Sequence, residues 1–153
     1  AIGPAGAAAL GKLLETNTGL EKLFMNENPI GAEGAKALAA GLGKNKGLTT
    51  LWMSSCGMGD EGATSLAGAL AKTGAKSLEV LDIWNNSIGP TGAQAIATAL
   101  ENNHRLRTLE LRLNPVGDAG AAAFAALMPK NVPLTTLDLI STGISDSGRQ
   151  VLQ

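Results

Sequence analysis

Short strand-like segments alternate along this chain with longer segments of helical periodicity. In residues 78–84, Leu81 and Ile83 alternate with Asp82 and Trp84. This period of two predicts a strand with one buried face, because successive side chains of a strand point to opposite sides. A turn that contains glycine then leads into a segment with a different period.

The second segment predicts a helix that packs along one side. Ala93, Ile96, Ala97 and Leu100 recur at the intervals of an apolar helical stripe. The same stripe is found in three other places: Ala35, Leu38, Ala39 and Leu42; Ala63, Leu66, Ala67 and Leu70; and Ala121, Phe124, Ala125 and Met128.

This strand–turn–helix unit is an internal repeat. The leucines that open the strands lie 28, 30, 28 and 28 residues apart, at Leu20, Leu48, Leu78, Leu106 and Leu134. We predict a single domain over residues 1–153, with a partial repeat 1–19, repeats 20–47, 48–77, 78–105 and 106–133, and a partial repeat 134–153. A loop near residues 73–77 takes up the two additional residues of the longer repeat.

One polar column follows the strands, and a glycine pair follows that column. The column consists of Asn28, Cys56, Asn86, Asn114 and Thr142, and an aliphatic residue and Gly-x-x-Gly come next in four of the copies. We expect the asparagines to tie neighbouring repeats together by hydrogen bonds to free backbone groups. The expected helix starts carry either a proline, at Pro4 and Pro90, or an acidic residue, at Asp60 and Asp118. Both residue types are favourable in the first turn of a helix.

The pattern L-x-x-L-x-L-x-x-[N/C]-x-[I/L]-G-x-x-G-A resembles the ribonuclease-inhibitor-like class of leucine-rich repeats over essentially the whole chain. The resemblance implies an α/β fold: a curved, right-handed solenoid in the shape of a horseshoe arc, with a parallel β-sheet on the concave face and α-helices on the convex face. Packing distances predict the same curvature, because parallel strands lie about 4.8 Å apart and helices about 8–10 Å apart.

Composition narrows the range of functions. The net charge is -1, so no global field favours nucleic acid, and no apolar run is long enough to predict a membrane span. The single cysteine cannot form an internal disulfide, which fits a reducing compartment or an incidental thiol. We therefore expect a cytoplasmic protein, or one delivered to the host cytosol if it resembles a bacterial effector.

The sequence predicts no catalytic residue, no cofactor and no metal. Gly57-Met-Gly59-Asp-Glu-Gly62 fits a dinucleotide fingerprint, but two of its glycines belong to the repeat columns. His104 has no second histidine or cysteine cluster to complete a metal site. The column Asp82, Glu110 and Asp138 is open to an acid/base interpretation, although recognition of a partner is favoured.

The concave face carries the candidate site. One column of outward positions reads Phe24, Trp52, Asp82, Glu110 and Asp138, and a second reads Asn26, Ser54, Trp84, Arg112 and Ile140. We expect Trp52 and Trp84 to come within reach of each other, and Arg112 to make a cation–π contact with Trp84. The predicted partner-binding residues are Phe24, Trp52, Asp82, Trp84, Glu110, Arg112 and Asp138.

The preferred function is protein–protein interaction through this concave face, with the acidic column selecting a partner that has a basic surface. Two alternatives remain open: a GTPase-activating protein that resembles the Ran activator, and the ligand-sensing fragment of a larger intracellular receptor or effector. Arg149 stands where the other helices pack alanine, and no polar capping repeat is evident. We therefore also predict self-association through the exposed ends of the solenoid.

Overall fold

The computed structural model describes residues 1–71, 75, 77–130 and 133–153, so residues 73, 74 and 76 of the expected loop lie outside it. The strands are β1 (Lys22–Phe24), β2 (Thr50–Trp52), β3 (Val80–Asp82), β4 (Thr108–Glu110) and β5 (Thr136–Asp138). The helices are α1 (Pro4–Leu14), α2 (Gly31–Leu42), α3 (Gly59–Ala71), α4 (Pro90–Leu100), α5 (Gly117–Leu127) and α6 (Asp146–Gln150), and a 3-10 turn, η1 (Met128–Lys130), follows α5.

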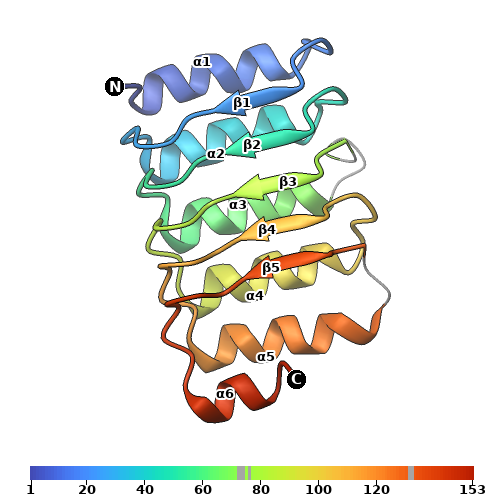
Figure 1. Cartoon of the computed structure of the whole chain (residues 1–153). Coiled ribbons are helices and arrows are strands. Elements are labelled where there is room, and N and C mark those ends of the chain that lie inside the picture. Colours follow the sequence, from blue (N-terminus) through green and yellow to red (C-terminus); the bar gives the residue numbers. More distant parts are fainter. Residues whose placement is uncertain (72–74, 76, 131–132) are drawn as a thin grey trace.

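The strands form one parallel sheet in the order β1-β2-β3-β4-β5. Their register places Phe24, Trp52, Asp82, Glu110 and Asp138 side by side, as the repeat spacing predicts. The helices form a second layer that fans out more widely than the strands (Figure 1). Helices need more lateral room than strands, so a stack of these units curves with its strands on the inner side. The arrangement confirms the predicted solenoid.

The core fills the space between the two layers. Leu51, Leu81 and Leu109 of the inner strands are at most 1% exposed. Leu38, Leu66 and Ile96 of the helices are fully buried. Small residues let the helices approach closely: a β-carbon on Gly41 would meet the backbone of Gly11 in the neighbouring helix. None of the described helices is long and apolar enough to cross a membrane.

Asparagine side chains bridge adjacent repeats at the ends of the strands, as the sequence predicts. The buried Asn86 amide donates to the Met53 carbonyl at 2.8 Å and to the Ile83 carbonyl at 3.0 Å. Its oxygen accepts from the Cys56 N–H at 2.9 Å. Asn114 accepts from the Asn86 N–H at 2.8 Å, so the bonds continue from one repeat to the next.

A second set of asparagines lies at the opposite ends of the strands, in the connections that lead from a helix to the next strand. The Asn45 amide donates to the Leu14 carbonyl at 2.8 Å, and its oxygen accepts from the Leu48 N–H at 2.7 Å. Asn103 bonds in the same way to the Leu70 carbonyl and the Leu106 N–H. Buried asparagine side chains therefore link adjacent repeats at both ends of the strands.

One predicted core position is wrong. Met128 is 44% exposed, although its column predicts burial. Helix α5 ends at Leu127, and Met128 begins the 3-10 turn η1. Leu127, the last residue of α5, is buried at 1% exposure.

Candidate functional site

The candidate site occupies the exposed face of the sheet, where strands β1 to β5 present one column of side chains. Phe24 and Trp52 pair at one end of this column, with ring centroids 4.6 Å apart and ring planes inclined at 46°. They are 56% and 39% exposed, respectively. Two large aromatic side chains therefore remain open to solvent on a rigid surface, which is typical of an anchor for a partner.

Trp84 lies two residues after Asp82, in the second column, and its ring contacts the Arg112 guanidinium. The Arg112 guanidinium carbon is 5.1 Å from the centroid of the Trp84 ring, which confirms the predicted cation–π contact. Trp52 and Trp84 line the same hollow, and the aromatic ring that pairs with Trp52 is that of Phe24. Ser54, in the column of Trp84, is only 1% exposed and does not contribute an open surface.

Three carboxylates follow the aromatic pair along the column. Burial raises the pKa of Asp82 above its usual value, although a hydrogen bond from the Trp84 N–H and the charge of Arg112 oppose this shift. Burial also raises the pKa of Glu110, and the neighbouring carboxyl groups of Asp138 and Asp82 add to the increase. The ionised forms of Asp82 and Glu110 are thus less favourable in this site than in free solution.

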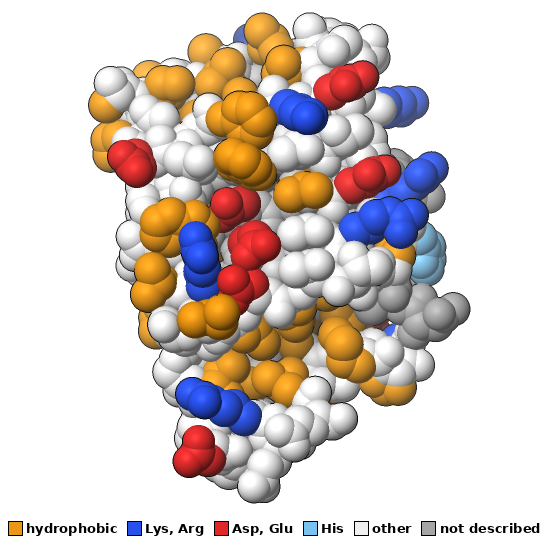
Figure 2. Space-filling model, in the orientation of Figure 1, with side chains coloured by type: hydrophobic (Ala, Val, Ile, Leu, Met, Phe, Trp, Pro, Cys, Tyr) orange, Lys and Arg blue, Asp and Glu red, His pale blue; other side chains and the backbone are white. Residues whose placement is uncertain are grey.

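A hollow of about 330 Å³ brings these groups together. Its lining comprises Trp52, Val80, Asp82, Trp84, Thr108, Glu110, Arg112 and Asp138. Figure 2 shows the acidic side chains gathered on the strand face, below an apolar group. Six of the seven predicted site residues line this hollow, and Phe24 joins it through its contact with Trp52.

Cys56 has the structural role that its column predicts. It is 1% exposed, and its Sγ donates to the Met25 carbonyl at 3.2 Å. Burial raises the pKa of the Cys56 thiol, which keeps it protonated and a poor nucleophile. Among the described residues, no three His, Cys, Asp or Glu side chains are grouped so that they could hold a metal ion.

Two apolar residues extend the exposed surface beyond the prediction. Leu113 is 50% exposed and Ile140 is 67% exposed, and they lie on adjacent strand ends joined by a Leu113 N–H to Ile140 carbonyl bond of 3.0 Å. Leu113 also has a left-handed backbone, with φ of 58°. The sequence placed Ile140 in the second column, but nothing in it indicated an exposed leucine in a left-handed conformation.

The repeat pattern identifies the family. A profile of the leucine-rich repeat family matches residues 16–39, 44–67, 74–97, 102–125 and 130–152. The chain therefore belongs to the leucine-rich repeat family. No curated protein matches it in sequence.

Two solved structures are similar to this chain. The C-terminal domain of tropomodulin from Caenorhabditis elegans has a TM-score of 0.78 and 14% identity, over 97% of this chain and 88% of that domain. A leiomodin-1 segment described as actin-binding site 2 has a TM-score of 0.75 and 21% identity, over 95% of this chain and 82% of that segment. At these identities the likeness concerns the fold alone.

Proposed function

We propose that this protein is an interaction module whose concave face binds a partner protein through a lysine or arginine side chain of the partner. The observation that carries this proposal is the hollow in which two tryptophans and three carboxylates face the same space. Indole rings attract cations, and the three carboxylates outnumber the one arginine beside them. A cationic side chain fits this combination better than an apolar or acidic one.

The electrostatics of the hollow favour the same partner. Burial raises the pKa of Asp82 and of Glu110, and the neighbouring carboxyl groups of Asp138 and Asp82 raise the pKa of Glu110 further. An incoming cation would stabilise both ionised forms and lower both pKa values. Binding should therefore weaken as the pH falls and these carboxyl groups take up protons.

Selection of random peptides displayed on phage tests the proposal without a known partner. Peptides that bind the native protein should be enriched in lysine or arginine. They should lose about 5- to 30-fold in affinity when Trp84→Ala is introduced, since a buried interface tryptophan contributes about 1–2 kcal/mol or more. Glu33→Gln on helix α2 is the matched control, because it removes a carboxylate on the opposite side of the molecule.

Two results would contradict the proposal. One is a set of binding peptides without cationic residues. The other is an affinity that Trp52→Ala and Trp84→Ala leave unchanged while the fold, followed by circular dichroism, is intact. Either would mean that the hollow is not the recognition surface.

Actin is the first named protein to test, because one similar solved structure is described as an actin-binding site of leiomodin-1. Co-sedimentation with filamentous actin, and a polymerisation assay with monomeric actin, would detect such binding. If binding uses the concave face, Trp84→Ala should weaken it and Glu33→Gln should not.

A further inference from the structure

One leucine inside the fourth repeat has two unfavourable features at once. Leu113 follows strand β4, and there its backbone has φ of 58° and its side chain is 50% exposed. A left-handed backbone brings the β-carbon of an L-residue close to the following carbonyl oxygen, so glycine and asparagine tolerate it best. An apolar side chain that stays in water also gains nothing from the hydrophobic effect. Neither feature stabilises the free molecule.

The other repeats show which residues this turn accepts. All the counterparts of the leucine are polar and have the same left-handed conformation, with φ of 53° to 59°: Glu27, Ser55, Asn85 and Ser141. The turn therefore needs a left-handed residue in each of these repeats, but it does not need a leucine. The reason for an apolar side chain at this position lies outside the turn itself.

A neighbouring repeat lies on each side of Leu113. The Asn85 N–H donates to the Arg112 carbonyl at 3.0 Å, and the Leu113 N–H donates to the Ile140 carbonyl at 3.0 Å. The backbone around Leu113 is thus bonded to the repeat before it and to the repeat after it. Its side chain is exposed because the turn directs it to solvent, and not because a neighbour is lacking.

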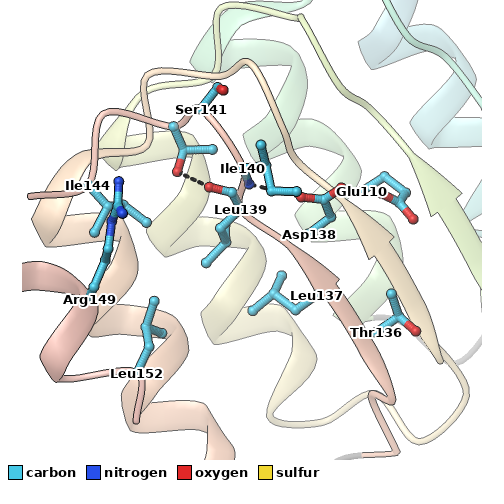
Figure 3. Close-up of a pocket in the computed structure, with 11 residues that line it drawn as sticks. Glu110, Thr136, Leu137, Asp138, Leu139, Ile140, Ser141, Ile144, Arg149 and Leu152 are labelled. Atoms are coloured by element: carbon cyan, nitrogen blue, oxygen red, sulfur yellow. Dashed lines mark hydrogen bonds between the residues drawn. The ribbon is translucent and has the colours of Figure 1, made fainter. Parts of the chain in front are cut away.

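Leu113 adjoins the hollow of the proposed binding site. Arg112, the residue before it, lines that hollow. On the next strand, the Ile140 N–H donates to the Asp138 carboxylate at 2.8 Å, and Figure 3 shows Ile140 beside Asp138, with Glu110 on the neighbouring strand. Figure 2 shows apolar side chains next to the acidic group on this face. The apolar position and the acidic column therefore belong to one continuous surface.

The spacing along the strand suits a short segment of a partner. Leu113 comes three residues after Glu110, and three residues of extended chain span at most about 11 Å. An extended partner segment covers that distance in about two to four residues. One segment can therefore place a cation in the hollow and a second side chain at Leu113.

The charges around Leu113 determine which kind of side chain fits there. The exposed Arg112 guanidinium lies over the Trp84 ring, with its carbon 5.1 Å from the ring centroid, directly before Leu113 in the chain. It repels a second cation at Leu113 but not an apolar group. The carboxylates of the hollow attract the cation instead, so the two positions select different side chains.

We propose that Leu113 binds an aliphatic side chain of the same partner segment whose lysine or arginine enters the hollow. This inference rests on the proposed function and adds a second recognised side chain to it. The recognised sequence is then a basic residue and a bulky aliphatic residue, about two to four residues apart. Binding would give Leu113 the burial that it lacks in the free protein.

Three substitutions at Leu113 separate its side chain from its backbone. Leu113→Gly and Leu113→Asn both suit a left-handed backbone, so neither should lower the melting temperature. Peptides selected on the native protein should bind both variants about 5- to 10-fold more weakly, because the exposed half of a leucine is no longer covered. Leu113→Met keeps an apolar side chain and should stay within about 2-fold. Asn85→Gly is the matched control in the same column and should leave the affinity unchanged.

Matching changes in a selected peptide show whether the two side chains meet. Replacing its aliphatic residue by alanine should cost about 5- to 10-fold on the native protein and almost nothing on Leu113→Asn, because a contact that is already lost cannot be lost again. Replacing its basic residue should cost the same on both proteins, since that residue binds in the hollow. Fluorescence anisotropy of labelled peptides measures all these affinities.

The outcomes separate this inference from the function on which it rests. Peptides that need a cation and Trp84, but bind the native protein and Leu113→Asn equally, would overturn the role of Leu113 and leave the hollow as the recognition site. Peptides without a cation, or a selection that yields no binder, would overturn both. Self-association of the native protein that Leu113→Asn abolishes in sedimentation velocity would overturn the inference as well, because the occupant would then be a second copy.

Discussion

The buried carboxamide of Asn86 offers the sharpest test of how the repeats hold together. Asn86→Ala removes its bonds to the carbonyls of Met53 and Ile83 and to the N–H of Cys56, which are 2.8, 3.0 and 2.9 Å long. Each buried backbone group left without a partner costs about 1–3 kcal/mol. Water that enters the vacated space would satisfy some of these groups, so we expect the free energy of unfolding to fall by about 3–5 kcal/mol. This is a large share of the total stability of a typical domain, about 5–15 kcal/mol.

Urea denaturation measures this loss, with circular dichroism and tryptophan fluorescence as two probes of the same transition. Asn85→Gly is the matched control: Asn85 is exposed and has φ of 53°, which glycine adopts readily, so the change should stay within about 0.5 kcal/mol. Asn86→Cys should fall between the two, because Cys56 fills the equivalent position with a weaker donor. Equal stability of Asn86→Ala and Asn85→Gly would refute the account of the asparagine column.

Three further predictions concern single positions. The raised pKa of Glu110 means that its folded form binds a proton more tightly than the unfolded form, so ionisation destabilises the fold as the pH rises. Glu110→Gln should therefore stabilise the protein by about 0.5 kcal/mol at pH 7, and this gain should vanish in denaturation curves below the unfolded pKa of about 4.3. Leu113→Gly should raise the unfolding free energy by about 0.5–1 kcal/mol, because φ of 58° strains leucine; a lower melting temperature would contradict this. Gly41→Ala should cost about 2–4 kcal/mol through its clash with the neighbouring helix, whereas Gly68→Ala, which faces open space in α3, should stabilise by about 0.5–1 kcal/mol in the same assay.

The repeat period was sufficient to predict which residues lie side by side on the sheet. A constant number of residues between strands brings Trp52 beside Asp82 and Asp82 beside Glu110, whatever the side chains are. The asparagine bonds were predictable for the same reason, because Asn86 and Asn114 occupy one column at the strand ends. Architecture in this fold depends on positions that every repeat shares.

Features that depend on individual side chains were not predictable in this way. Trp52 can turn toward either neighbouring strand, and the choice of Phe24 is a matter of rotamer and local packing. The exposure of Met128 depends on where α5 stops. The second asparagine set did leave a signal, since Asn45 and Asn103 both stand three residues before a strand leucine, but polar residues in loops are too common for that signal to be decisive.

Most of the candidate site lies on the inner strands of the sheet. Trp52, Asp82, Trp84, Glu110 and Arg112 lie on or directly after β2 to β4. Each of these strands is paired on both sides, so its register is fixed by two neighbours. A partner side chain that enters the hollow therefore meets groups on an ordered backbone, and little ordering of the site opposes binding.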